Sequence, residues 1–136
     1  MDIAPADAKL VPISADHFAS VAEFLHKEMN SKVSIDQWQR VIAANWSSDA
    51  PNHGFMLHHE AVGVVGVLCA IYAHVVIDGE IRNVCNPHTW CVLDAFRKRS
   101  IELVVAVIKQ PDWHFSMLSP NAEGEQIFSF LKFFLG

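Results

Sequence analysis

Three consecutive cations, Arg97, Lys98 and Arg99, stand between two apolar runs and are followed by Ser100. They belong to a chain with 10 lysine and arginine residues and a formal net charge of -5. If the second run, Ile101 to Ile108, is a helix, its first N–H groups lack partners and its dipole is positive at this end. Such a helix start favours anions such as phosphate. We therefore predict a local anion site at this basic turn, residues 97–100.

Glu102 lies in the first turn of the same predicted helix and weighs against a strong anion site. A carboxylate there suits the dipole of an empty helix, but it repels a bound diphosphate. In the alternative interpretation the basic turn is only a solvated helix cap. Glu102 then pairs with Arg99 or Lys98, an exposed interaction worth less than about 1 kcal/mol. The sequence leaves both interpretations open.

The 8 histidines raise the question of a metal site. The densest group is His58 and His59, with His53 nearby. Adjacent residues of a strand point to opposite faces, so His58 and His59 cannot both bind one ion from a regular strand. No cysteine or carboxylate spacing supports zinc either. We predict no metal site.

The 3 cysteines, Cys69, Cys85 and Cys91, form no C-x-x-C pair and lie in apolar, strand-like sequence. This usage predicts reduced thiols in the core and not a disulfide framework. Nothing in the sequence predicts a lowered pKa for the Cys91 thiol, so a cysteine nucleophile is not expected.

Length and composition limit the class of protein. The 136 residues have the length of one domain, and we predict a single domain over residues 1–136. A content of 51% hydrophobic and 18% charged residues excludes a disordered chain. With 15 acidic against 10 basic residues, the chain gives no broad basic surface for duplex nucleic acid.

The longest apolar run, Ala61 to Ile77, is too rich in Val and Ile to be read simply as a membrane helix. It is followed by Asp78-Gly79, a strong hairpin signal, so we interpret it as strand and expect no membrane span. The N-terminus, MDIAPADAK, lacks the basic start and apolar core of a signal peptide. A cytoplasmic protein is expected.

Helical periodicity is clearest in the first third of the chain. A short strand over residues 9–13 precedes a helix that Ser14 caps and that extends to Asn30. Ser34 and Gln37 fit a capping box at the start of a second helix. The apolar face of that helix is predicted to consist of Trp38, Val41, Ile42 and Trp46.

Strand patterns dominate the middle of the chain. A meander is predicted over residues 55–59, 62–77 and 81–92, with a bulge or interruption at Asn86-Pro87. Residues 101–108 are ambiguous between helix and strand, because β-branched residues favour a strand while the preceding basic turn suits a helix start. Residues 113–118 alternate like a strand, and a last helix is expected over 122–135. The order β, α, α, β, β, β, α, β, α predicts an α/β or α+β fold with a mixed, mostly antiparallel sheet flanked by helices.

This order of elements resembles the GNAT superfamily of N-acetyltransferases. In that family the fourth strand runs into the signature V-x-P-x-[YF]-R-x-x-G-x-[GA], and Val92, Phe96 and Arg97 match it here. The sequence departs from the signature where Asp94 replaces the proline, and where Ser100 and Glu102 replace the small residues.

Other segments are similar to the family in weaker ways. Val65 to Leu68 with Asp78-Gly79 is similar to its third strand and hairpin. Ser119 to Asn121 and Ile127 to Phe133 are similar to its fifth-strand exit and last helix. The resemblance therefore covers nearly the whole chain, in element order more than in motif identity.

The resemblance implies acetyl-CoA as the cofactor. In the family the pyrophosphate of coenzyme A lies at the helix start that here corresponds to the basic turn, and the pantetheine lies between the fourth and fifth strands. The thioester carbonyl meets a main-chain N–H of the fourth strand, which here falls near Cys91 or Val92. The implied partners are an acyl-CoA and a small-molecule or peptide amine, with no role for nucleic acid or membrane.

Acetyl transfer to an amine also needs a base and an acid. His88 on the fourth predicted strand is the best-placed base, and His74 and Glu80 are weaker candidates. In the family the acid is usually a tyrosine on the last helix, and the position that corresponds here is Phe128. Phenylalanine cannot donate a proton, and the single tyrosine, Tyr72, lies in the third predicted strand.

A second hypothesis is a non-catalytic GNAT-fold binding or dimerisation module. The sequence stops at Gly136, where the family usually adds two more strands that form a wall of the acceptor site. An apolar edge left in this way would favour a homodimer, through an edge strand or through Phe128 to Leu135. The leading hypothesis remains a GNAT-like acyl-CoA-dependent N-acyltransferase, whose acceptor cannot be read from the sequence.

Overall fold

The computed structural model describes residues 7–115. In chain order its α-helices and strands are β1 (Ala8–Pro12), α1 (Phe18–Glu28), α2 (Ile35–Ala43), β2 (Gly54–His59), β3 (Gly63–Ile77), β4 (Glu80–Val92), α3 (Ser100–Ile108) and β5 (His114–Phe115). Two 3-10 helices, η2 (Ala15–His17) and η3 (Asp94–Arg99), lead directly into α1 and α3. The predicted order is confirmed as far as β5. The predicted last helix, 122–135, lies outside the described residues.

The five strands form one sheet in the order β1-β2-β3-β4-β5. The first four pair antiparallel with their neighbours. β5 runs parallel to β4, with His114 opposite Val84 and Phe115 opposite Cys85. The mixed, mostly antiparallel sheet that the sequence predicts is therefore confirmed.

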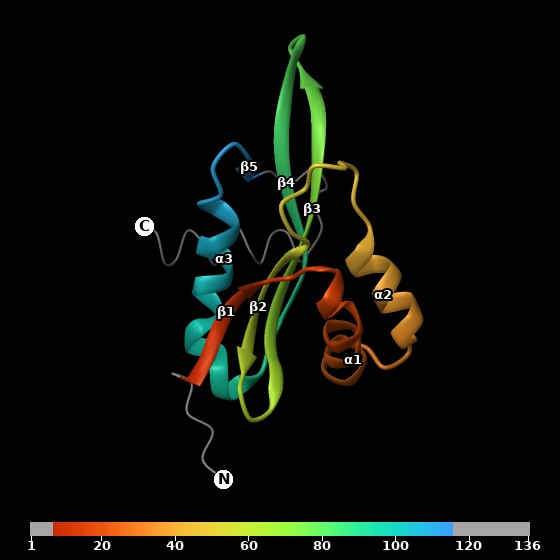
Figure 1. Cartoon of the computed structure of the whole chain (residues 1–136), viewed down its shortest axis with the longest axis vertical. Coiled ribbons are helices and arrows are strands. Elements are labelled where there is room, and N and C mark those ends of the chain that lie inside the picture. Colours follow the sequence, from red (N-terminus) through yellow and green to blue (C-terminus); the bar gives the residue numbers. More distant parts are fainter. Residues whose placement is uncertain (1–6, 116–136) are drawn as a thin grey trace.

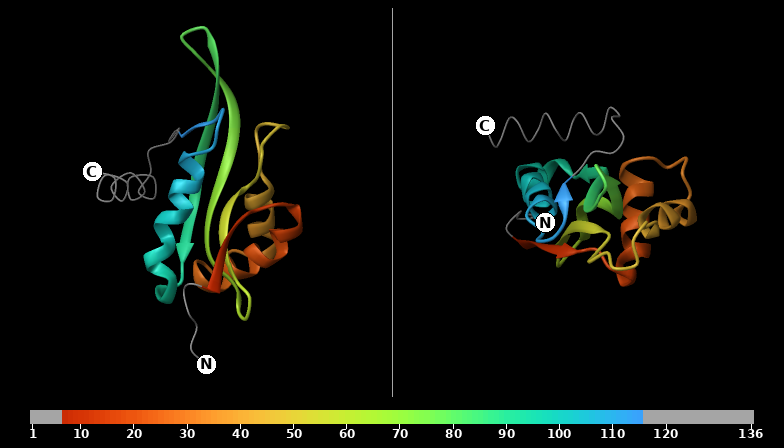
Figure 2. Two further views of the ribbon diagram at one scale, coloured as in Figure 1. Left: turned by 60° about the vertical axis from the view of Figure 1, so that its left-hand side comes forward. Right: turned by 90° about the horizontal axis from the view of Figure 1, so that it is seen from above.

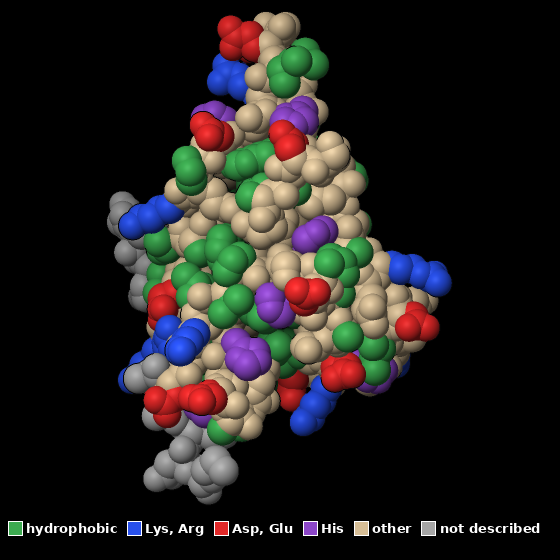
Figure 3. Space-filling model, viewed as in Figure 1, with side chains coloured by type: hydrophobic (Ala, Val, Ile, Leu, Met, Phe, Trp, Pro, Cys, Tyr) green, Lys and Arg blue, Asp and Glu red, His purple; other side chains and the backbone are tan. Residues whose placement is uncertain are grey.

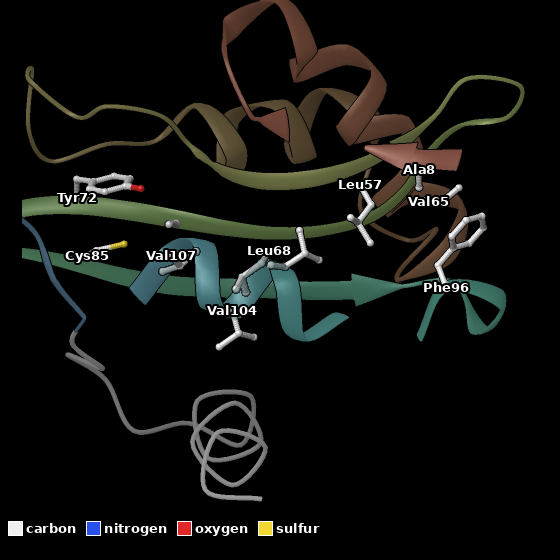
Figure 4. Packing of buried hydrophobic residues seen from close by; sticks show 11 residues of the cluster. Ala8, Leu57, Val65, Leu68, Tyr72, Cys85, Phe96, Val104 and Val107 are labelled. Carbon is white, nitrogen blue, oxygen red and sulfur yellow. The ribbon is translucent and has the colours of Figure 1, made fainter. Parts of the chain in front are cut away.

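Helices cover both faces of the sheet, with α1 and α2 on one face and α3 on the other (Figures 1 and 2). Leu103, Val104 and Val107 of α3 share one apolar cluster with Leu68 and Tyr72 of β3. Figure 4 shows Val104, Val107, Leu68 and Tyr72 of this cluster. On the opposite face a second apolar cluster joins both helices to the sheet through Val21, Leu25, Ile42, Met56 and Val67. Because α3 is buried against the sheet along its length, its β-branched residues do not prevent a helix, and the ambiguity over 101–108 is resolved.

Local signals position α2 as predicted at its start but not at its end. The Ser34 hydroxyl accepts the Gln37 N–H at 3.1 Å, and the Gln37 side-chain oxygen accepts the Ser34 N–H at 2.9 Å, which completes the capping box. Trp38 and Ile42 are buried, as the periodicity predicts. The prediction was wrong for Val41, which is 39% exposed, and for Trp46. Trp46 follows the end of α2, and its side chain is 64% exposed.

β4 carries a bulge at His88. Cys69 of β3 lies opposite Thr89, but the next residue, Ala70, lies opposite Pro87, so His88 is the extra residue in β4. The sequence predicts this irregularity one residue earlier, at Asn86-Pro87. A bulge bends a strand and re-aims its side chains, which makes this part of β4 a place where the regular sheet is interrupted.

The hairpin of β3 and β4 extends well beyond the other strands (Figure 1). Its two-residue turn has positive φ angles at both Asp78 (53°) and Gly79 (80°), which is the type I′ geometry that matches the twist of paired strands. The hairpin signal Asp78-Gly79 in the sequence is thus confirmed.

Candidate functional site

The basic turn is helical in the structure. η3 includes Arg97, Lys98 and Arg99, and α3 begins at Ser100 without a break. The Ser100 N–H donates to the Arg97 carbonyl, so the start of α3 is already partly satisfied by the 3-10 turn before it. The helical segment therefore begins at η3 and not at Ser100. The N–H groups without helical partners are expected at the start of η3, next to Asp94.

Arg99 is held by hydrogen bonds to Glu102 and to the backbone of Ala8. Its Nε donates to Glu102 Oε2 at 2.6 Å and its Nη2 to Glu102 Oε1 at 2.9 Å, and its Nη1 donates to the Ala8 carbonyl of β1. The side chain is 20% exposed. Each partner of this bidentate pair stabilises the charged form of the other, so the pKa of Glu102 is lowered and that of Arg99 is raised. The Arg99–Glu102 pairing that the sequence left open is present.

Arg97 and Lys98 are the accessible cations of the basic turn. Arg97 Nη2 donates to Asp94 Oδ1 at 2.7 Å, but both side chains are exposed, at 71% and 92%. Such an exposed pair is worth less than about 1 kcal/mol and can be exchanged for another anion. Lys98 is exposed, and within residues 7–115 no acidic side chain forms an ion pair with it.

Ser100 faces inward. It is 4% exposed, and its hydroxyl donates to the Arg97 carbonyl at 2.7 Å. The side chain that replaces the small residue of the family signature thus caps the last turn of η3 and does not point into solvent.

A hollow of about 430 Å³ lies at the end of β4 beside the basic turn. Its lining residues are Glu28, Trp90, Cys91, Val92, Leu93, Asp94 and Arg97. The structure therefore brings three of the sequence-predicted site residues, Cys91, Val92 and Arg97, to one concave surface. The other members of the basic turn do not line it.

Glu28 is the member of this hollow that sequence reasoning missed. It is the last residue of α1, on the face of the sheet opposite α3. Burial raises the pKa of the Cys91 thiol, the Glu28 charge raises it further, and the Arg97 charge lowers it. Only the crossing of α1 over the sheet brings Glu28 beside Cys91, so no local pattern in the sequence could have marked it.

His88 is largely buried at the bulge of β4. Its Nδ1 lies 2.9 Å from the Thr89 hydroxyl, and its Nε2 is buried without a hydrogen-bond partner among the described residues. Burial lowers the pKa of His88 to about 4, so the imidazole is neutral at pH 7. This unsatisfied nitrogen distinguishes His88 from the other candidate bases, but His88 is not among the residues that line the hollow.

Tyr72 is not placed to act as an acid. Its side chain is fully buried under α3, and its hydroxyl donates to Asn52 Oδ1 and contacts the Gln110 amide. Burial and the nearby Cys85 raise the pKa of Tyr72. The hydroxyl therefore ties the loop before β2 to the end of α3, which is a structural role. Phe128 lies outside the described residues.

His74 is part of an exposed network toward the turn end of the hairpin, where it pairs with Asn83. Its Nε2 lies 2.9 Å from Asp49 Oδ1 and 3.0 Å from the Ser47 hydroxyl, and its Nδ1 lies 2.6 Å from Asn83 Oδ1. The ring also lies 5.6 Å from that of Trp113. Serine and aspartate both meet the same nitrogen, so the group lacks the relay geometry of a hydrolase triad.

This network predicts a pH dependence. The hydrogen bond to Asp49, then that to Asn83, raises the pKa of His74, while the hydrogen bonds from Ser47 and His74 lower the pKa of Asp49. The stabilisation from His74 is therefore full below about pH 6.5 and is lost as pH rises through its raised pKa. That from Asp49 is full above about pH 4 and is lost on further acidification. We expect the Cε1 proton resonance of His74 to titrate above the usual pKa of a histidine.

Asp49→Asn should return the His74 midpoint toward the value of a free histidine, and Asp112→Asn, which removes a carboxylate outside this network, should leave it unchanged. A His74 midpoint that Asp49→Asn does not move would contradict the assigned pairing.

The remaining candidates do not form a site. His58 is exposed and His59 buried, on opposite faces of β2, as the strand geometry requires. Among residues 7–115, no group of three or more His, Cys, Asp or Glu side chains could hold a metal ion. The three cysteines are free thiols, and burial raises the pKa of Cys69 to about 12 and that of Cys85 to about 11. None of the helices in this part of the chain has the length and apolar composition to cross a bilayer.

Comparison with models of protein families gives no match, and comparison with curated proteins also gives none. Solved structures do match. An acetyltransferase from Trypanosoma brucei has a TM-score of 0.60 at 14% identity, over 92% of this chain and 91% of that chain. An aminoglycoside acetyltransferase from an uncultured soil metagenomic sample has a TM-score of 0.51 at 14% identity, over 95% and 90%. The fold is GNAT-like.

A third match is to a protein with a bound acyl-CoA. The N-myristoyltransferase of Saccharomyces cerevisiae, solved with myristoyl-CoA, has a TM-score of 0.51 at 13% identity, over 76% of this chain but 26% of that chain. The GNAT-like fold predicted from the sequence is thus confirmed. At these identities the likeness establishes the fold and not the reaction.

Proposed function

We propose that this protein is a GNAT-like, acyl-CoA-dependent N-acyltransferase that transfers an acetyl group to an amine. The observation that carries the proposal is the hollow at the end of β4, which joins Cys91 and Val92 to Arg97. The GNAT-like fold and its acetyltransferase neighbours support it. A strand end and a cation at one hollow are suited to an extended ligand with an anionic end.

Coenzyme A, the cofactor that the fold implies, fits the residues in part. The exposed Arg97 and Lys98 are free to bind its phosphates, because the Asp94 partner of Arg97 is itself exposed and weakly held. Arg99 does not fit this role, since Glu102 and the Ala8 carbonyl hold it. The hollow beside Cys91 and Val92 would hold the thioester end. Of the three cations that the sequence predicts, Arg97 and Lys98 are therefore the proposed phosphate ligands.

Main-chain groups of β4, His88 and Glu28 would have different roles in acetyl transfer. Bound acyl-CoA supplies an activated thioester. Main-chain N–H groups near Cys91 and Val92 would polarise its carbonyl, which no side chain needs to do. In the transfer the amide C–N bond would form and the thioester C–S bond would break. His88, neutral at pH 7, would take the amine proton at Nε2, and its pKa of about 4 would let it give that proton to the departing thiolate. The Glu28 carboxylate at the edge of the hollow would attract a cationic amine.

A non-catalytic binding module is the second candidate function. The inward Ser100 and the Arg99–Glu102 pair favour it, because Ser100 and Glu102 replace the small residues of the family signature and Glu102 holds Arg99. In this case the fold would bind a ligand or a second copy of the chain without acetyl transfer. The amine acceptor, whether a small molecule or a peptide, a cytoplasmic location and a homodimer are also proposals.

Titration calorimetry with acetyl-CoA tests the proposal. We expect binding by the wild-type chain, and we expect Arg97→Ala combined with Lys98→Ala to weaken it about tenfold or more, since each cation–phosphate contact contributes about 1 kcal/mol. Lys109→Ala, an exposed cation at the other end of α3, is the matched control and should bind like the wild type.

No heat at millimolar acetyl-CoA would contradict the enzyme proposal. Binding that the double substitution leaves unchanged would contradict the phosphate position but not the function. Binding without transfer to any amine in a broad panel would favour the binding module.

A further inference from the structure

The outer edge of β4 is open at the tip of the hairpin. In residues 7–115, β5 pairs with β4 only at Val84 and Cys85, so no described strand pairs with residues 80–83 on that side. An open strand edge presents backbone N–H and C=O groups that can pair with another strand. Ile81 in this edge is 73% exposed, and Val76 opposite it in β3 is 72% exposed.

The turn geometry decides which backbone groups face outward. In a type I′ turn the carbonyl of the residue before the turn accepts the N–H of the residue after it, so Glu80 is hydrogen-bonded toward β3. Backbone groups of successive residues alternate in direction along an antiparallel pair. The N–H and C=O of Ile81 therefore point away from β3, to the open edge. A partner strand can pair there without disturbing the hairpin.

The side chains of this edge are complementary to themselves. If two copies pair antiparallel about a two-fold axis at Ile81, Glu80 of one lies opposite Arg82 of the other, and the reverse pair forms as well. Glu80 and Arg82 already lie on the same face of β4, because Arg82 Nη2 donates to Glu80 Oε2 at 3.2 Å within one chain. Both side chains are substantially exposed, at 71% and 47%, so the intermolecular exchange costs little.

On the other face the same arrangement brings hydrophobic side chains together. Ile81 would meet Ile81 of the second copy, and Val76 of each copy lies beside its own Ile81 through the register of β3 and β4. The two Ile81 side chains would thus meet across the interface, with Val76 of each copy on the outer side of this hydrophobic row. Acidic, basic and hydrophobic side chains all reach the surface at this end of the molecule (Figure 3).

Space for the partner is present beside the edge. A hollow of about 400 Å³ is lined by Glu80, Ile81, Arg82, Asn83, Asp112 and His114. Pairing centred on Ile81 places Gly79 of the second copy opposite Asn83, beside this hollow. The paired stretch ends there, because His114 of β5 already lies opposite Val84. Among the described residues, Gly79 has no atom within 4 Å of where a Cβ would be, so the turn itself is unobstructed.

From this geometry we infer that the β3–β4 hairpin is a homodimerisation arm, in which the β4 edges of two copies pair antiparallel about Ile81. The opposite charges fix the register, and the two open edges are closed against each other. This surface is remote from the hollow that holds the proposed acyl-CoA site, because it lies at the turn end of the hairpin and that hollow at the other end of β4. The inference does not depend on the proposed function.

Charge reversal tests the inference without ligand. Sedimentation velocity of the full chain over a concentration series should show a monomer–dimer equilibrium. Glu80→Arg or Arg82→Glu alone places like charges opposite each other and should weaken self-association at least about tenfold. An equimolar mixture of the two variants should restore association. In the heterodimer one chain has arginine at positions 80 and 82 and the other has glutamate at both, so every pair across the interface is an arginine opposite a glutamate. The ion pair within one chain is broken in both variants and cannot explain such a rescue.

Ile81→Pro removes the outward N–H without altering charge and should weaken the dimer in the wild-type background. A wild-type chain that stays monomeric up to its solubility limit would overturn the inference. A dimer that both single charge reversals leave intact would also overturn it, because the copies would then meet through another surface. Circular dichroism of each variant identifies any that fails to fold.

Discussion

Replacing Gly54 with alanine should lower the free energy of unfolding by about 3 kcal/mol or more. Gly54 has a φ of 110°, a region that costs a residue with a side chain about 1–3 kcal/mol. A Cβ there would overlap the Leu68 carbonyl oxygen and lie 2.7 Å from the Cα of Cys69. Both are backbone atoms of β3 beside the bulge, so they cannot move aside as a flexible side chain would.

The position of Gly54 in the sheet makes the strain hard to relieve. Its carbonyl accepts the Ile13 N–H at 2.9 Å, and its N–H donates to Asn52 Oδ1 at 2.9 Å. Relieving the overlap would break these contacts, of which the first holds the start of β2 to Ile13, the residue after β1. Overpacking of this kind adds about 1–3 kcal/mol to the conformational cost.

Urea unfolding followed by circular dichroism measures this effect. Gly63→Ala is the matched control, because Gly63 also has a positive φ, 87°, but no described atom lies within 4 Å of the position that its Cβ would take. It should cost only about 1–2 kcal/mol. Equal losses for the two variants would show that conformation alone, and not the contact with β3, makes glycine necessary at position 54.

Phe96→Ala should destabilise the protein by about 3–5 kcal/mol, the range for a large aromatic side chain removed from a core. Phe96 is 1% exposed and lies at the end of the α3 cluster near Ala8 and Val65 (Figure 4). Its ring also meets His59 edge-on, with centroids 5.8 Å apart. Because Phe96 is the buried residue of η3, it is the anchor of the segment that includes the basic turn.

The same variant has a second expected effect. Without its anchor the basic turn should lose its fixed position, so acetyl-CoA binding should weaken even under conditions where the chain is folded. Phe96→Leu retains most of the hydrophobic volume and should cost less than about 1.5 kcal/mol. A loss below about 1 kcal/mol for Phe96→Ala would contradict the role of this residue in the core.

The helices and strands were largely predictable because local interactions set them. The capping box at Ser34 and Gln37 and the turn at Asp78-Gly79 each involve residues within three positions of one another. Predictions became unreliable where the outcome depended on distant packing. Residues 101–108 form a helix because the sheet covers them, and Trp46 is exposed because α2 ends before it.

The candidate site was predictable only in its location. The signature around Val92, Phe96 and Arg97 directs attention to the end of β4, and a hollow is found there. Its composition was not predictable, since Glu28 reaches it from α1 on another part of the chain. The buried and unpartnered state of His88 Nε2 among the described residues likewise depends on neighbours that the local sequence does not specify.

By itself the sequence determined the order of the elements, the position of the hairpin and the place of the basic turn, because periodicity, caps and turn residues act over a few positions. Tertiary structure decided which charges of that turn are available. Arg99 is held by a carbonyl 91 residues away, at Ala8, as well as by Glu102, whereas Arg97 and Lys98 remain exposed. The physical reason is that ion pairs and burial are set by contacts between distant segments, and these contacts exist only once the sheet has formed.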